Sequence, residues 1–278
     1  MRTHPITFVC LMVGVLSASE VAVAQQAEEF HPYFTRDFEI GVGAFFMAKE
    51  LKLRVNGSDR GDLIDLEEVA RLDNNEITGA LDFRWHFGDK WSFEAQGWKV
   101  SDSGGAVLTE DIHWEDVVFE EGTFAEAGLD VTIARLFFGR KFWQRPNQEF
   151  GAGVGAHWME IDAFLQGQIL TNLGDTEVYR GNVGADVPLP NIGAWYNWSW
   201  SPRWMLKARL DWLSARIGDY SGGLLDGQVG VNWQVFRNVG IGFFVNGFTL
   251  DVNVKKESWK GGAKTEQIGP LLTLTASW

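Results

Sequence analysis

Charged and apolar side chains alternate along parts of this chain with a period of two residues. In the segment 203–217, Lys207, Arg209 and Asp211 occupy one parity, while Trp204 and Trp212 belong to the apolar residues of the other. Successive side chains of an extended strand point to opposite faces, so the three charges share one face. Charges of both signs on one face can form ion pairs, which a buried polar face requires.

The same parity collects charges from several other segments. If the strands form a closed wall, this parity faces an interior in which ions must be paired. We expect the interior to be lined by Arg84, Glu94, Arg135, Lys207, Arg209 and Asp211. Further polar residues of this parity are Glu39, Asp82, Gln96, His157, Asn197, Gln228, Asn232, Gln234 and Asn246. These residues either pack into a polar plug or line a narrow water-filled channel and set its selectivity.

Several glycines fall on the inward parity as well: Gly41, Gly43, Gly151, Gly153, Gly155, Gly240 and Gly242. They either thin the wall around an open lumen or leave space for large side chains such as Trp195 and Phe244.

Two long acidic segments could bind cations. In the run 110–121, Asp111, Glu115 and Asp116 offer carboxylates to a divalent ion such as calcium. The run lacks the alternating Asp/Asn pattern with a central glycine that marks a calcium loop, so a solvated acidic surface is the simpler interpretation. In the loop 57–74, the helical spacing of Leu63, Leu66 and Val69 predicts a short amphipathic turn over the barrel mouth. We expect neither a metal nor a cofactor.

A hydrolase is the less favoured alternative. The histidines after residue 24 are His31, His86, His113 and His157, and none stands in the His-x-Ser-Asn arrangement of the outer-membrane phospholipases. His113 lies between Asp111 and Asp116, which superficially suits a protease that pairs carboxylates with an imidazole. Because acidic loops with one histidine are common, we expect a protein that is not an enzyme.

Ten alternating segments must position these side chains. They lie near residues 37–56, 75–88, 90–102, 124–143, 149–166, 187–200, 203–217, 224–237, 239–254 and 265–278. Each is at least as long as a tilted membrane-spanning strand needs to be. The pattern predicts an all-β fold, a transmembrane antiparallel up-and-down β-barrel of about ten strands. Eight strands would result if 37–56 and 90–102 were misread, and twelve if residues 106–119 inserted as another hairpin.

Aromatic residues gather at the ends of the segments, beside short polar turns. We expect a girdle at the membrane interface formed by Trp85, Trp91, Trp143, Trp200, Trp204 and Trp278. The turns at this level are short and most of the opposite connections are long, which is typical of outer-membrane topology with both termini in the periplasm.

The last nine residues form an alternating strand that stops at Trp278. A final strand with an aromatic carboxyl terminus resembles the strand by which the barrel-assembly machinery recognises outer-membrane barrels. The expected partners are therefore that machinery, outer-membrane lipid and lipopolysaccharide.

The N-terminal residues predict export. Arg2 precedes an apolar run over 6–16, and Ala22-Val23-Ala24 offers a signal-peptidase site. We expect residues 1–24 to be a cleaved signal peptide, 25–36 a periplasmic segment and 37–278 an outer-membrane barrel. Cleavage removes Cys10, the chain's one cysteine, so disulfides and cysteine metal sites are excluded.

The composition excludes other classes of protein. The chain has 24 Lys and Arg against 37 Asp and Glu, a net charge of −13, which argues against a nucleic-acid partner. Its 14 Trp, 20 Phe and 32 Gly against 7 Pro suit a barrel wall.

Four short motifs carry a resemblance. Ile64-Asp-Leu-Glu-Glu68, Leu-Pro-Asn-Ile-Gly at 189–193, Gly-Asp-Tyr-Ser-Gly at 218–222 and the terminal Gly-Pro strand make the chain similar to a proteobacterial family of outer-membrane barrels that has no assigned activity. The likeness spans nearly all of the chain after residue 24. It implies only the fold and a location in the Gram-negative outer membrane, because its motifs are those of turns and loops and not of a catalytic site.

The expected role is structural or porin-like, a barrel whose polar interior is plugged or passes small solutes. A surface interaction module that binds cations, lipopolysaccharide or a partner through the acidic loops is the alternative, and an outer-membrane lipid or peptide hydrolase is the less favoured one.

Overall fold

The computed structural model describes residues 30–56, 64–65, 75–109, 111–114, 117–170, 176–217, 220–255 and 260–278. The expected signal peptide, 1–24, lies outside these residues and stays a prediction. Within the described ranges, no helix is long and apolar enough to cross a bilayer.

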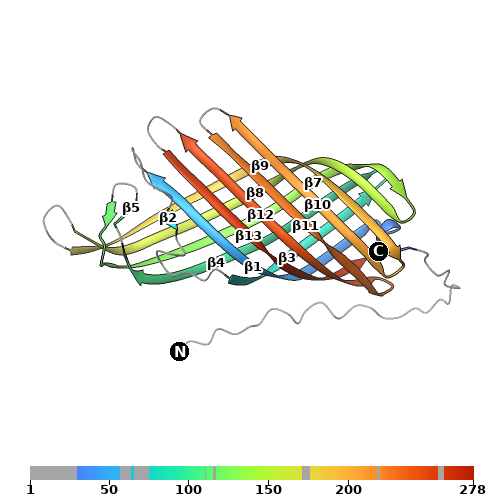
Figure 1. Cartoon of the computed structure of the whole chain (residues 1–278), viewed down its shortest axis with the longest axis horizontal. Helices are drawn as coiled ribbons and strands as arrows, with labels where there is room; N and C mark the ends of the chain where they lie inside the picture. Colours follow the sequence, from blue (N-terminus) through green and yellow to red (C-terminus); the bar gives the residue numbers. More distant parts are fainter. Residues whose placement is uncertain are drawn as a thin grey trace.

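Ten long antiparallel strands form a closed barrel (Figure 1). They are β1 (Phe38–Asn56), β3 (Asn75–Phe87), β4 (Trp91–Val107), β7 (Phe124–Arg145), β8 (Gln148–Leu170), β9 (Thr176–Ser201), β10 (Trp204–Ile217), β11 (Tyr220–Phe236), β12 (Val239–Lys255) and β13 (Lys260–Ser277). β13 pairs with β1 and closes the wall. The predicted fold and the count of ten are confirmed, so neither eight nor twelve strands is correct.

The segment 30–36, the carboxyl end and the short turns lie at one end of the barrel, which we call the turn side (Figure 1). Phe38 and Trp278 exchange backbone hydrogen bonds of 3.0 and 3.1 Å there. Gly88 in the turn from β3 to β4 has a φ of 56°, a left-handed conformation that glycine adopts without strain. We call the opposite end the loop side.

The outward faces of the strands carry a band of apolar side chains that begins at the turn side. On β8 the band runs from Phe150 to Trp158, and on β10 it runs from Trp204 to Trp212. Both ranges match the length of about 9–11 residues that a tilted strand needs to cross hydrocarbon.

Beyond the band the alternation inverts. On β8 the outward residues become Glu160 and Asp162, which are exposed, and the inward residues change from His157 to the buried Met159 and Ile161. An outer face of this kind suits water, and an apolar interior is what stabilises a sheet that has water outside.

The expectation of a polar interior is therefore wrong for the loop-side half of the barrel. On β4, Trp98 and Val100 follow Gln96 along the inward face, while the outward face carries Lys99 and Ser101. The inward apolar residues form one buried cluster with members such as Phe45, Met47, Ile133, Phe248 and Leu250. The interior thus has a polar half and a mainly apolar half, in which Lys49 and Gln267 are buried polar exceptions.

The wall divides into two sheets above the band. β3 pairs with β4 only over Ala80–Phe87, and β10 pairs with β9 only over Trp204–Trp212. Beyond these ranges, β4, β7, β8 and β9 form one sheet, and the remaining long strands form the other. In Figure 1 the green and yellow strands diverge from the orange and red ones.

Two prolines mark the point where β9 separates from β10. The Ser199 N–H donates to Asn147 O, so odd-numbered residues of β9 bond toward β8. Pro188 and Pro190 have the other parity and face the edge that β10 has left, beyond Ile192. Proline has no N–H, so no ladder hydrogen bond is lost at this edge.

A small hairpin, β5 (Ile112–Trp114) and β6 (Val117–Phe119), closes the loop side. Ile112 and Phe119 are buried in the apolar cluster, so β5 and β6 form a lid and not an additional spanning hairpin. An amphipathic turn was expected near 63–69, but Ile64–Asp65 form a short strand, β2, that pairs with β1. The rest of the expected turn lies outside the described residues.

Several strands are longer than predicted on the loop side. β9 begins at Thr176 and not near 187, β4 continues to Val107, and β11 begins at Tyr220 inside the expected link 219–223. The alternation of apolar-out and polar-in residues could not identify these extensions, because it inverts where they begin.

We expect Val229→Arg to lower the free energy of unfolding by about 2–4 kcal/mol, because the guanidinium would enter hydrocarbon. Val229 is 52% exposed and lies at the centre of the apolar band of β11. Ser214→Arg is the matched control, since Ser214 is an exposed residue of β10 beyond the band. Urea unfolding in lipid vesicles measures both, and equal losses would contradict this position of the band.

Candidate functional site

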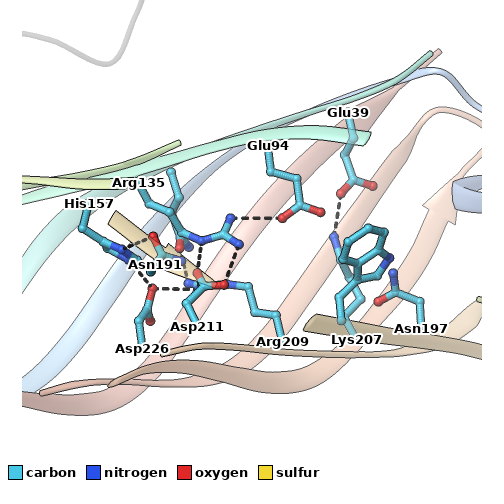
Figure 2. Close-up of polar contacts among 12 residues, drawn as sticks. Glu39, Glu94, Arg135, His157, Asn191, Asn197, Lys207, Arg209, Asp211 and Asp226 are labelled. Atoms are coloured by element: carbon cyan, nitrogen blue, oxygen red, sulfur yellow. Dashed lines mark hydrogen bonds and ion pairs between the residues drawn. The ribbon is translucent and has the colours of Figure 1, made fainter. Parts of the chain in front are cut away.

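Most inward charges meet in the turn-side half of the barrel, in what we call the polar layer (Figure 2). Its members are Glu39, Asp82, Arg84, Glu94, Gln96, Arg135, His157, Lys207, Arg209, Asp211 and Asp226. All six residues that we predicted to line the interior are among them. Arg84, Arg135 and Asp211 are 4%, 2% and 0% exposed. Lys49 is buried farther toward the loop side, where it pairs with Glu76 and Asp102.

Arg135 of β7 reaches across the interior to Asp211 of β10. Its Nε and Nη2 donate to the two carboxylate oxygens, the latter over 3.2 Å, and its Nη1 donates to Glu94 Oε2 over 3.0 Å. The Arg135 and Asp211 side chains are 3% and 1% exposed. This bidentate pair joins opposite walls of the barrel, and each charge depends on the other because water cannot replace it.

Arg209 extends the network along β10 and β11. Its Nη1 donates to Asp226 Oδ2 over 2.7 Å, and its Nη2 donates to Gln96. His157 Nε2 lies 3.0 Å from Asp226 Oδ2, and His157 Nδ1 lies 3.2 Å from Asn191 Oδ1. The ion pairs and these hydrogen bonds form one continuous system.

Three groups of this system have the types of a metal site. His157, Asp211 and Asp226 each place one donor atom within 4.8 Å of the others. Arg135 and Arg209 already donate to both carboxylates. A metal ion on both carboxylates would compete with Arg209 for its two carboxylate partners and with Arg135 for one of its two, so the donor set fits an ion-pair network better than a metal centre.

A second group of polar contacts surrounds Glu149 at the turn side. Its Oε1 accepts from Trp195 Nε1 and from Asn197 Nδ2, each over 3.0 Å. Lys141 Nζ lies 3.4 Å from Glu149 Oε2. Glu149 is 0% exposed, and our sequence reasoning missed it because it directly follows the predicted turn.

The segment 30–36 enters the turn-side end of the barrel. It contains the short helix η1 (Pro32–Phe34), and His31 and Tyr33 are each 1% exposed. The Tyr33 hydroxyl donates to Glu149 Oε1 over 3.2 Å and accepts from Asn197 Nδ2 over 2.8 Å. This segment was expected to be periplasmic, and its compartment stays a prediction.

Two cations face the Tyr33 ring. The Arg84 guanidinium carbon lies 4.1 Å and Lys207 Nζ lies 5.0 Å from the ring centroid. Lys207 also pairs with Glu39 over 2.8 Å, whereas no carboxylate of the described residues forms an ion pair with Arg84. The electron-rich face of the Tyr33 ring is therefore the electrostatic partner of this buried guanidinium.

A cavity of about 60 Å³ lies behind Tyr33. The polar layer supplies most of its lining, including Arg84, Asp82 and Glu94, and Gln228 also borders it. The volume has room for a few water molecules, so the described interior holds a small charged cavity between two closed ends.

The inward glycines make room for large side chains. A Cβ on Gly151 would lie 2.1 Å from the Trp195 ring, and one on Gly242 would lie 2.2 Å from the Phe244 ring. This geometry supports the second of the two interpretations of these glycines.

Asp226 and Tyr33 are two further residues that sequence reasoning missed, as are Lys141 and Asn191. Asp226 has the parity of Gln228 and stands near the end of a predicted segment, so extending the alternation by one step would have found it. Tyr33 has no periodic neighbours, and no pattern in the sequence pointed to it.

The six predicted girdle tryptophans lie on the outside of the barrel near its turn side. Their exposed fractions range from 36% for Trp204 to 53% for Trp278. Phe38 stacks on both Trp85 and Trp278, and Trp204 stacks on Trp200 and Trp233. Their contact with lipid headgroups stays a prediction.

The predicted loop cation site is described only in part. Asp111 is exposed, and its Oδ1 accepts from the Glu121 N–H over 2.8 Å. Glu115 and Asp116 lie outside the described residues, as does the side chain of His113. The structure therefore does not bring this set together or separate it.

Comparisons with known proteins bear on the fold alone. No protein-family model and no curated protein matches the chain. The outer membrane protease OmpT from Escherichia coli is 11% identical, with a TM-score of 0.55 over 91% of this chain and 99% of that one. The Pseudomonas putida toluene transporter TodX (10% identical, TM-score 0.30, 87% and 90% covered) and Ail of Yersinia pestis (11%, 0.24, 85% and 98%) also match. The fold is that of outer-membrane β-barrels.

We expect Arg135→Met and Asp211→Leu each to lower the free energy of unfolding by about 3–5 kcal/mol, because each leaves a partner charged and buried. The double variant should lose far less than the two losses together, since no unpaired charge remains on this pair. Urea unfolding in vesicles completes the cycle. Additive losses would show that the two residues do not act as a pair.

Docking of the 30–36 segment should weaken in acid. Burial lowers the pKa of His31 from 6.5 to about 4, so the docked form prefers the neutral imidazole. The stabilisation is complete above pH 6.5 and is lost as the pH falls toward 4, by about 3 kcal/mol at most. Hydrogen exchange of the Tyr33 amide measures it. His31→Gln should remove the pH dependence, and an unchanged profile in that variant would contradict this role of His31.

Proposed function

We propose that this protein is a closed outer-membrane barrel with a structural role. It holds the loop-side parts of its strands outside the membrane and does not conduct solutes in its resting form. One observation carries the proposal: buried side chains occupy the described interior at each level from the turn side to the loop side. The segment 30–36 enters the turn side, the polar layer and the apolar cluster follow, and the lid β5–β6 closes the loop side.

The location rests on the wall and on both chain ends. The outward apolar band, the exposed girdle tryptophans and the predicted signal peptide support the outer membrane of a Gram-negative cell. Lipid and lipopolysaccharide are the proposed surroundings. The proposed assembly partner is the barrel-assembly machinery, which would bind the final strand through its end at Trp278.

Two features argue against an open pore. The charged cavity is only about 60 Å³, and the cluster beyond it consists almost entirely of side chains that cannot hydrogen-bond to a passing ion. The polar layer is therefore proposed to be a packed plug.

A hydrolase is not favoured by the geometry either. The described histidine–carboxylate pair, His157 and Asp226, is fully buried and bound to Arg209 and Asn191. A substrate would have to reach the imidazole through the filled interior, so the proposal includes no catalytic step.

A surface interaction role is the second candidate, and the two diverging sheets favour it. The outward face of the sheet β4, β7, β8 and β9 carries exposed carboxylates beyond the band, among them Glu126, Asp130, Glu160, Asp162 and Asp186. A surface of this charge attracts cations and the ions that bridge lipopolysaccharide phosphates. A closed barrel would hold such a surface at a fixed height above the membrane.

We expect the refolded chain, beginning at residue 25, to give no discrete conductance steps in planar bilayers, because no continuous water path crosses the apolar half. Heat-modifiable mobility confirms folding, and an open porin in the same bilayers confirms that insertion is detected. Discrete steps from the folded protein would contradict the closed barrel and restore the pore interpretation.

A further inference from the structure

The contacts of residues 30–36 are those of a bound peptide. The backbone-to-backbone hydrogen bonds of this segment are internal: Phe34 N donates to His31 O, and Thr35 N and Arg36 N donate to Pro32 O. Ladder pairing with the wall begins only at β1. The segment can therefore leave without breaking any strand pairing.

Side chains hold the segment in a built site. The Tyr33 hydroxyl lies between Asn197 and Glu149, and its ring lies beside Arg84 and Lys207. The His31 N–H donates to Ser199 Oγ over 3.1 Å. A hydroxyl that both donates and accepts, attached to a ring that contacts two cations, is specific for a phenol.

His31 contributes a second, directional contact. Its Nδ1 accepts the Tyr33 N–H over 3.2 Å, so its proton lies on Nε2, which faces Asn232 Oδ1 at 3.1 Å. Glu39, Lys207 and Arg84 are the charged groups that act on this ring. Protonation of Nδ1 would remove the acceptor for the Tyr33 amide and add a charge beside two cations.

Release of Tyr33 would uncover the polar layer. Tyr33 itself lines the cavity, together with Arg84, Lys207 and Gln228. The apolar cluster closes the far side, so removal of the segment would give a blind pocket that opens at the turn side.

We propose that residues 30–36 are a tethered ligand for a tyrosyl-binding site at the turn-side end of the barrel, and that their release opens a charge-lined blind pocket. The site recognises a peptide that carries a tyrosine in a short helical turn. This inference goes beyond the closed barrel, since it concerns one end and predicts no through-channel.

Cysteine labelling tests the proposal, because Cys10 is the one cysteine and a chain that begins at residue 25 has none. Gln228→Cys places a thiol on the cavity wall, and a small charged methanethiosulfonate is the probe. With the segment docked, labelling should be slow. Deletion of residues 25–36 or Tyr33→Ala should speed it by about 100-fold, and Tyr33→Phe by about tenfold, since it loses only the hydroxyl contacts.

A synthetic peptide of residues 30–36, added to the deletion variant, should restore slow labelling, and the same peptide with phenylalanine in place of the tyrosine should do so more weakly. Ser214→Cys is exposed on the outer face and should label at one rate in every background. Heat-modifiable mobility shows that each variant has folded.

Two results would overturn the proposal. One is rapid labelling of Gln228→Cys in the otherwise unaltered chain, at the rate of Ser214→Cys. The other is slow labelling in a folded variant that lacks residues 25–36. Neither result changes the conductance test, so failure of the tethered ligand is distinguishable from failure of the closed barrel.

Discussion

A strand in hydrocarbon cannot leave a backbone N–H or C=O without a partner, and this constraint determines the architecture. β13 pairs with β1, so the wall has no free edge within the apolar band. Closure also assigns the two faces of every strand, one to lipid and one to the interior. Charges on the inner face lose water, and pairing such as that of Arg135 with Asp211 and Arg209 with Asp226 offsets the loss.

Whether lipid or water covers the outer face of the wall explains whether the interior side chains are polar or apolar. Where lipid covers the outer face, the interior is free to be polar, and the polar layer lies at that height. Where the outer face carries Glu160 and Asp162, the interior carries Met159 and Ile161. Only burial of apolar surface inside can stabilise strands with water outside. Closure is no longer required there, and the wall divides into two sheets. Pro188 and Pro190 lie at one of the free edges that this division creates.

The sequence allowed the barrel, its ten strands and most of the polar layer to be predicted, because one period of two residues encodes all three. The loop-side extensions, such as residues 176–186 of β9, could not be predicted from that pattern, since the apolar face changes sides within a strand. Tyr33 was also beyond prediction. Its position depends on where Asn197, Glu149, Arg84 and Lys207 meet in space, and no local repeat records this.

Spin labels placed along β8 from 150 to 166 in lipid bilayers, omitting Gly151, Gly153 and Gly155 because no side chain fits there, test the inversion most directly. Outward sites from 150 to 158 should be accessible to oxygen dissolved in lipid. Outward sites from 160 onward should be accessible to a water-soluble nickel complex, and inward sites throughout should be accessible to neither. Oxygen access at the outward sites beyond 160, or nickel access along the inward face, would contradict a sealed barrel whose interior changes from polar to apolar at the membrane boundary.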